Sequence, residues 1–123
     1  VKIKMTIKKC FMFYVSCFVL YNFLMLKQAR LYIKGDVIGV GFRAWTKIQA
    51  KLTAVSGWVR NVYDKPEIFG VSGGVEVVIQ GEEEKVKKMT DLLHQGPTVS
   101  RVDEVEVFYE EVKEIFSEFE IVK

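Results

Sequence analysis

The chain has 123 residues, of which 50% are apolar and 13% aromatic, enough for one globular domain with a hydrophobic core but not for two. Its formal charge of +2 is unevenly distributed, because five of the 18 basic residues and none of the 16 acidic residues precede residue 29. The remaining body has 13 basic and 16 acidic residues and therefore a net charge of −3. A slightly acidic body argues against nucleic acid as the main partner.

The first 28 residues differ in character from the rest. Residues 10–26 form an apolar run of 17 uncharged residues, close to the roughly 20 that cross a bilayer. Three hypotheses fit it: a membrane anchor, a cleaved secretory signal, or a translated upstream segment that is not native, with the natural chain starting at Met25. Contact with a membrane is expected only if the run is native, and otherwise we expect a cytoplasmic protein. The only cysteines, Cys10 and Cys17, lie in this run, so the body has no disulfide or cysteine nucleophile.

The body begins with a predicted strand and a predicted helix. Over residues 29–34 apolar and polar side chains alternate, which is the period of a half-buried strand with Ala29, Leu31 and Ile33 on one face. From residue 42 the apolar spacing changes to three and four, which predicts an amphipathic helix. The predicted buried stripe consists of Phe42, Trp45, Ile48, Leu52 and Val55. Residues 35–43, with the sequence G-D-V-I-G-V-G-F-R, therefore lead into a helix N-terminus.

This glycine-rich segment suits an anion. Gly35, Gly39 and Gly41 remove the side chains that would keep a phosphate away from the main chain, and they permit backbone angles closed to other residues. The N–H groups and the positive dipole end of the following helix attract the same anion. Arg43 adds a permanent charge whose planar fork matches two phosphate oxygens. We therefore predict an oxyanion cradle.

Two other families of glycine loop were weighed against this prediction. A Walker-type loop requires G-x-x-x-x-G-K-[ST], and no lysine followed by Ser or Thr occurs here. Gly39, Gly41 and Ala44 fit the dinucleotide fingerprint G-x-G-x-x-A, with Asp64 further along the chain. That fold needs an apolar strand that runs directly into the first glycine, whereas residues 34–36 interrupt this strand. The chain is also too short for two nucleotide-binding halves.

The remaining elements follow in order. They are a strand at residues 58–63, a strand at 75–80, a helix that begins at 82–84 and ends at Gly96 and Pro97, a strand at 104–109 and a short edge strand at 119–121. Alternation in the strand at 75–80 predicts burial on one face only. The acidic residues 82–84 favour the positive end of the helix dipole, so we interpret them as a solvated helix start and not as a metal site.

Residues 64–74 read as a loop in which Ile68 and Phe69 look exposed. We interpret it as a tolerated insertion or as a segment that closes over a substrate. The order strand, helix, strand, strand, helix, strand predicts the α+β class, with a ferredoxin-like βαββαβ sandwich. Its sheet should be antiparallel, with both helices on one face.

The glycine-rich segment resembles the signature of the acylphosphatases, G-x-V-Q-G-V-G-F-R with a hydroxyl residue three positions after the arginine. The matching residues are Gly35, Val37, Gly39, Val40, Gly41, Phe42, Arg43 and Thr46. Ile38 replaces the usual glutamine, so this position keeps its backbone N–H and lacks the amide side chain. A second family motif, G-W-V-[RQ]-N, occurs at residues 57–61, and the resemblance extends over residues 29–123.

The resemblance implies a hydrolase that splits the carboxyl–phosphate bond of small-molecule acyl phosphates. It implies that Arg43 and the backbone of the loop hold the phosphate; the loop residues are Ile38, Gly39, Val40, Gly41 and Phe42. It also implies that Asn61 positions the attacking water, and we assign Gly35 and Thr46 to the support of the loop. The leaving carboxylate has a pKa of about 4, so no strong general acid is needed. We expect no metal, no cofactor and a monomer.

Two other polar residues are expected to serve structure. Arg60 is interpreted as a solvated neighbour of Asn61, and His94 as a favourable group at the end of the second helix. Two binding modules remain as alternatives: a ferredoxin-like RNA-binding domain, and a domain that binds phosphate or carbamoyl phosphate without turnover. The position of Phe42 outside a central strand argues against the first, and the absence of cysteine-rich zinc segments argues against the second.

Overall fold

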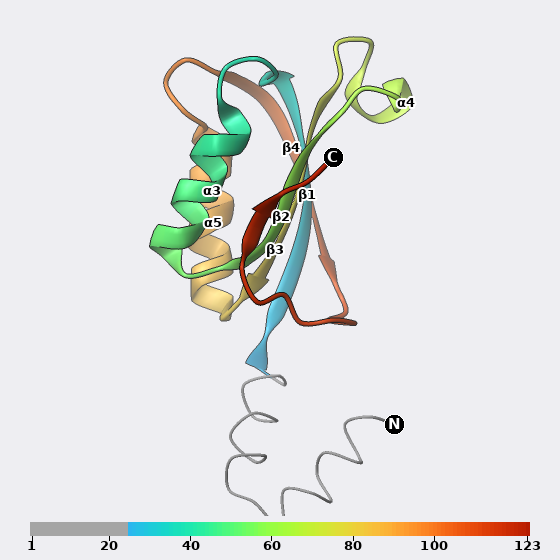
Figure 1. The fold of residues 1–123 in the computed structure, drawn as a ribbon. Helices are drawn as coiled ribbons and strands as arrows, with labels where there is room; N and C mark the ends of the chain where they lie inside the picture. Colours follow the sequence, from blue (N-terminus) through green and yellow to red (C-terminus); the bar gives the residue numbers. More distant parts are fainter. Residues whose placement is uncertain (1–24) are drawn as a thin grey trace, which may run out of the picture.

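The computed structural model describes residues 25–123, which Figure 1 draws in colour. The predictions for Cys10, Cys17 and the apolar run lie outside the described residues, apart from the last two residues of the run. The elements are β1 (Lys27–Asp36), α3 (Phe42–Thr53), β2 (Ser56–Val62), α4 (Pro66–Phe69), β3 (Gly74–Gly81), α5 (Glu83–Gln95), β4 (Arg101–Glu110) and β5 (Phe119–Ile121). Within residues 25–123, no helix combines the length and the apolar character needed to cross a bilayer.

Five strands form one sheet in the order β4-β1-β3-β2-β5. The four long strands pair antiparallel, whereas β5 pairs with β2 in parallel. The sheet is therefore mixed: the predicted antiparallel sheet has one parallel edge strand. The helices α3 and α5 cover the same face of it (Figure 1), which confirms the predicted βαββαβ sandwich.

Strand β1 lies inside the sheet, between β3 and β4, and carries the chain into the glycine-rich loop. Ala29, Leu31 and Ile33 are fully buried in the core, as predicted. The ladder with β4 shifts register just before Gly35. Gly35 has a φ of +132°, and a Cβ at this position would lie 2.2 Å from the carbonyl oxygen of Arg101, so glycine is required. Beyond this irregularity Gly35 and Asp36 still pair with β4, and the chain then enters the loop.

The predicted apolar stripe of α3 is wrong in phase. Phe42 and Val55 are buried and Trp45 is half-buried, but Ile48 and Leu52 are 58% and 75% exposed. The buried residues of α3 are Phe42, Thr46, Ala50 and Thr53. The two threonine hydroxyls donate to the carbonyl oxygens one turn earlier, at 2.8 Å each, so they enter the core with their polar atoms paired.

Strand β3 is buried on both faces, although alternation predicts burial on one. All eight of its residues are buried. On the face without helices, the guanidinium groups of Arg30 and Arg60 form ion pairs with Glu76, which is 3% exposed. Both guanidinium groups also lie over the ring of Trp58, at 5.6 and 5.4 Å from its centre. The long side chains of Arg30 and Arg60, on neighbouring strands, therefore cover the charge of Glu76, which the alternating pattern predicts to be exposed to solvent.

The same layer of charged side chains extends to β4. Glu110 accepts hydrogen bonds from Arg30 Nε at 3.0 Å and from Gln28 Nε2 at 2.9 Å. Burial alone would raise the pKa of Glu110, but these hydrogen bonds and the charge of Arg30 outweigh it and hold the pKa below its usual 4.5.

The segment between β2 and β3 differs from the prediction of an exposed loop. It contains the single helical turn α4, and Phe69 is only 8% exposed while Ile68 is half-buried. The ring of Phe69 meets that of Tyr32 edge-on, with 5.5 Å between their centres. Tyr32 projects from the face of the sheet opposite to the helices. Phe69 is therefore an anchor for this segment and does not close over a substrate.

Candidate active site

The glycine-rich loop, residues 37–41, lies between the end of β1 and the start of α3, at the top of Figure 1. Gly39 and Gly41 have φ values of +80° and +78°, and a Cβ at either would meet no heavy atom within 4 Å. The backbone is therefore open to a ligand. Gly41 is the N-cap of α3, and no side chain caps this helix. The first N–H groups of α3 thus keep their capacity to bind an anion.

Arg43 is the second residue of α3, and its side chain is exposed. Within the described part of the chain, no side chain or carbonyl forms a hydrogen bond or ion pair with its guanidinium. The other three arginines, Arg30, Arg60 and Arg101, are each paired with a carboxylate. Arg43 therefore keeps its fork for a ligand beside the loop.

Phe42 and Thr46 fix the junction between the loop and α3. Thr46 is fully buried, and its Oγ1 donates to the carbonyl oxygen of Phe42 at 2.8 Å. The ring of Phe42 is 1% exposed and packs against Trp45, with 5.6 Å between ring centres. These contacts hold the first turn of α3 in the core, directly after the loop. The hydrogen bond of Thr46 to its own helix is the supporting role expected of this residue.

Asn61 lies near the end of β2, on the same face as the buried Val59. It pairs with Val75 of β3, which pairs in turn with Ile33 of β1, so the amide and the glycine-rich loop lie at the same end of the sheet. Asn61 Nδ2 donates to the hydroxyl of Tyr63 at 3.1 Å. Its Oδ1 is buried and has no hydrogen-bond partner among residues 25–123. A buried amide oxygen without a partner is rare in folded proteins, and it marks this position as a candidate for binding a ligand or a water molecule.

Ile38 connects the loop with the segment after β2. A Cβ on Gly73 would lie 3.1 Å from Ile38 Cδ1 and 3.4 Å from Tyr63 Cδ1, so all three residues are adjacent. Through Tyr63 this group reaches Asn61. The structure thus brings the predicted loop and the predicted amide together. Sequence reasoning missed Tyr63, although a residue two positions after Asn61 continues the same face of the strand.

The two residues expected to be structural, Arg60 and His94, lie outside the group formed by Ile38, Tyr63 and Asn61. Arg60 is not merely a solvated neighbour, because it projects from the opposite face of β2 and forms an ion pair with Glu76 at 2.7 Å. His94 lies in the last turn of α5, as predicted, and its Nδ1 is 2.9 Å from the carbonyl oxygen of Thr90. Among the described residues, no group of three or more His, Cys, Asp or Glu side chains is arranged to hold a metal ion.

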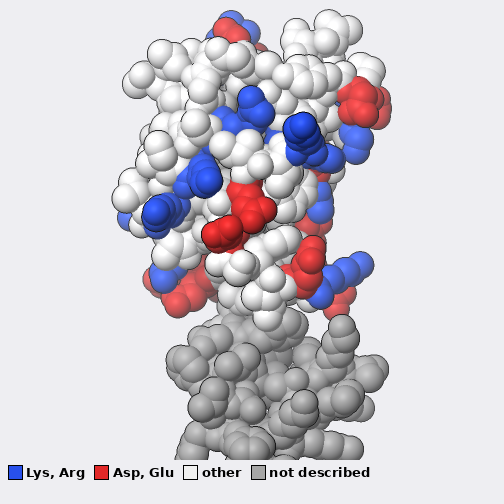
Figure 2. All heavy atoms as spheres, viewed as in Figure 1, with Lys and Arg blue, Asp and Glu red and all other residues white. Residues whose placement is uncertain are grey.

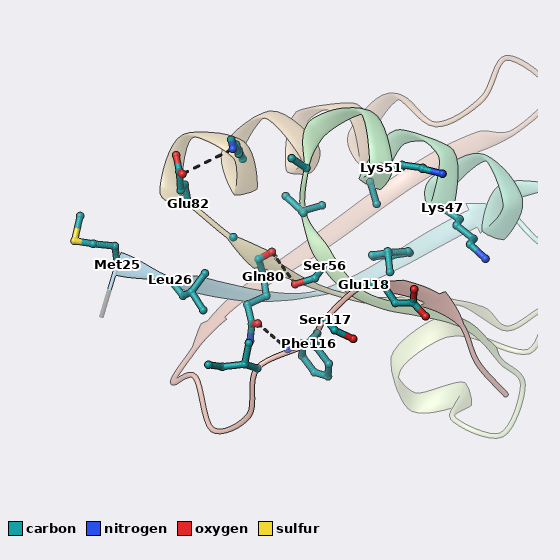
Figure 3. A pocket seen from close by; sticks show the side chains of 17 residues that line it. Met25, Leu26, Lys47, Lys51, Ser56, Gln80, Glu82, Phe116, Ser117 and Glu118 are labelled. Carbon is teal, nitrogen blue, oxygen red and sulfur yellow. Dashed lines mark hydrogen bonds and ion pairs between the residues drawn. The ribbon is translucent and has the colours of Figure 1, made fainter. Parts of the chain in front are cut away.

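A cavity of the described structure lies elsewhere. It has a volume of about 950 Å³ and is bounded by the second half of α3, the start of α5 and residues 115–119. Figure 3 shows Lys47, Lys51 and Gln80 among its lining side chains. Neither Arg43 nor Asn61 lines it, and it lies toward the end of the sheet opposite to the loop. The candidate site is therefore the surface around the glycine-rich loop.

The surface charge does not form a single basic area on the face in view. Figure 2 shows Lys and Arg side chains interspersed with Asp and Glu side chains on the described part of that face. Nucleic-acid binding uses a continuous basic patch or stripe. This face therefore gives no support to the RNA-binding alternative.

Comparisons with known proteins point to one family. The family model described as Acylphosphatase matches residues 29–121. An acylphosphatase of Syntrophobacter fumaroxidans is 40% identical over 95 residues, which are 77% of this chain and 90% of that protein. The crystal structure of an acylphosphatase from Bacillus subtilis is similar with a TM-score of 0.69 and 30% identity, over 80% of this chain and 100% of that one. Full-length HypF, in a phosphate- and nucleotide-bound form, matches with a TM-score of 0.68 and 28% identity over 80% of this chain and 12% of its own.

Proposed function

The chain belongs to the acylphosphatase family, and we propose that it hydrolyses the carboxyl–phosphate bond of acyl phosphates to a carboxylate and inorganic phosphate. One observation carries the proposal for how it does so. An open glycine loop at a helix N-terminus, an exposed arginine and a buried amide oxygen lie at one end of the sheet, and neither side-chain group is paired within residues 25–123. These are groups that would bind the phosphoryl oxygens and a water molecule.

The phosphoryl group is held by the loop and by Arg43. We expect the backbone N–H groups of residues 38–43 to converge on it, because Gly39 and Gly41 have left-handed backbone angles and carry no side chains. The guanidinium of Arg43 donates two parallel hydrogen bonds to two phosphoryl oxygens. Both sets of donors bind most strongly when charge accumulates on those oxygens in the transition state.

Asn61 orients the nucleophile. Its Oδ1 accepts a hydrogen bond from a water molecule, which then keeps a lone pair directed at phosphorus. The water oxygen forms a bond to phosphorus, while the bond between phosphorus and the acyl oxygen breaks and its electron pair leaves with the carboxylate. The protons of the water are transferred to phosphate oxygens and solvent. Because a carboxylate is a stable leaving group, positioning and charge are sufficient.

Hydrolysis of an aryl acyl phosphate by the full chain, with a chelator present, tests this proposal. We expect turnover that persists with the chelator and falls at least tenfold in both Arg43→Gln and Asn61→Ala. The Asn61→Ala variant should lose turnover and retain its affinity for phosphate. Arg101→Gln, which changes an arginine paired with Asp103, is the matched control and should keep wild-type activity.

The remaining alternative is a domain that binds phosphate or carbamoyl phosphate without turning it over. The similarity to a small part of the HypF chain favours this alternative over the RNA-binding one. A folded wild-type protein that binds phosphate but hydrolyses no acyl phosphate would support it. In that case Ile38, which stands where the family has glutamine, is the first residue to replace.

A further inference from the structure

We propose that Tyr63 is a positioning residue for Asn61, which fixes the side-chain amide with Oδ1 available to the attacking water. The inference rests on the proposed function, because it deepens the role given to Asn61 there. Tyr63 comes directly after β2 and is 65% exposed. It lies outside the G-W-V-R-N motif at residues 57–61, so its importance comes from the contact it makes in this structure.

That contact uses one half of the Asn61 amide. Asn61 Nδ2 donates to the hydroxyl of Tyr63 at 3.1 Å, and Oδ1 is buried without a partner among the described residues. A buried acceptor without a partner is unfavourable in a folded protein. Its presence next to the glycine-rich loop indicates an oxygen kept for a ligand.

The orientation of the amide decides what it can do to water. Oδ1 can only accept a hydrogen bond and Nδ2 can only donate one. A water that donates to Oδ1 keeps its lone pairs for phosphorus, whereas a water that accepts from Nδ2 uses one of them. In this structure the Tyr63 hydroxyl accepts from Nδ2, which corresponds to the first arrangement, and its own proton is free to bond to bulk water.

The segment between β2 and β3 supports the tyrosine ring. Gly73 brings the chain back past this ring, because a Cβ there would lie 3.4 Å from Tyr63 Cδ1 and 3.1 Å from Ile38 Cδ1. Phe69, packed on Tyr32, fastens the same segment to the sheet. The ring of Tyr63 therefore stands beside Gly73 and Ile38, with its hydroxyl directed to Asn61.

Tyr63→Phe tests the inference because it removes only the hydroxyl and leaves the ring. We expect kcat to fall about fivefold, while KM and the inhibition constant of phosphate stay unchanged. Tyr109→Phe is the matched control, since Tyr109 is also 65% exposed but lies on β4, and it should keep the wild-type kcat.

A double-mutant cycle separates positioning from a structural effect. In the Asn61→Ala background, Tyr63→Phe should cause no further loss of kcat, because the amide it acts through is absent. An equal loss in both backgrounds would overturn the inference, and so would an unchanged kcat in the single variant.

The side-chain amide signals of Asn61 in an NMR spectrum give a second readout that needs no turnover. Tyr63→Phe should shift them and Tyr109→Phe should not; unshifted signals in Tyr63→Phe would overturn the inference. If the wild type hydrolyses no acyl phosphate, the proposed function fails, and the NMR measurement still decides whether Tyr63 holds the amide.

Discussion

Replacing Arg43 with lysine keeps one positive charge and removes the planar fork, so it tests the phosphate clamp directly. The guanidinium has no partner within residues 25–123 and the side chain is exposed, so the exchange should change the free energy of unfolding by less than about 0.5 kcal/mol. Of two parallel hydrogen bonds to phosphate, lysine retains one. Losing one donor directed at developing charge costs about 2–4 kcal/mol. At about 1.36 kcal/mol per factor of ten, kcat/KM should fall about 30- to 900-fold.

The assay is the hydrolysis of an aryl acyl phosphate, followed as loss of absorbance, with thermal unfolding of each variant measured in parallel. Arg101→Lys is the matched control, because it makes the same exchange at an exposed arginine that is already paired with Asp103. Wild-type kcat/KM in Arg43→Lys would refute the two-bond clamp. A large drop in its melting temperature would instead show that Arg43 supports the fold.

Four further predictions concern glycine, packing and charge. Gly39→Ala should fold with a small loss of stability, because its φ of +80° strains any side chain, and it should bind phosphate weakly in calorimetry, because its methyl group meets no protein atom within 4 Å and takes space left for the ligand. Gly35→Ala should fail to fold by circular dichroism, because its Cβ would lie 2.2 Å from a backbone carbonyl oxygen of β4. Phe69→Ala should cost about 3 kcal/mol and make residues 64–73 sensitive to limited proteolysis. Glu110 has a lowered pKa in the folded state, so it contributes stability above its unfolded pKa of about 4.5 and loses it as the pH falls through the folded value. Glu110→Gln should therefore destabilise the protein to urea at pH 7 and have little effect at pH 2.

The order of elements could be predicted from the sequence because local patterns determine it. For example, β1 follows from the alternation of adjacent residues, and the end of α5 follows from the glycine that comes directly after it. The errors occur where contacts that a periodic pattern does not contain determine which side chains are buried. Thr46 is buried on α3 in place of Ile48 because its hydroxyl finds a carbonyl oxygen one turn away, and Glu76 is buried because two arginines on adjacent strands reach it.

The candidate site was predictable in part. The loop and its helix N-terminus follow from the spacing of glycines, and Asn61 was found through the G-W-V-R-N motif. To predict its contact with Tyr63, one must know the direction of the chain after β2. To predict that Ile38 lies beside Gly73, one must know the path of the segment between β2 and β3. A sequence pattern gives neither the direction nor the path. The roles of Arg43 and Asn61 in catalysis stay predictions until their variants are measured.

The position of β1 inside the sheet has a consequence for how the protein is made. Its two partners, β3 and β4, follow it far along the chain, and the side chains of Gln28 and Glu110, which meet across one of these pairings, are 82 residues apart in sequence. During synthesis β1 therefore leaves the ribosome long before either neighbour exists, with its apolar face unpaired. The glycine-rich loop follows directly after this strand. The nascent chain can complete the pairing of this strand only after β4 has been made.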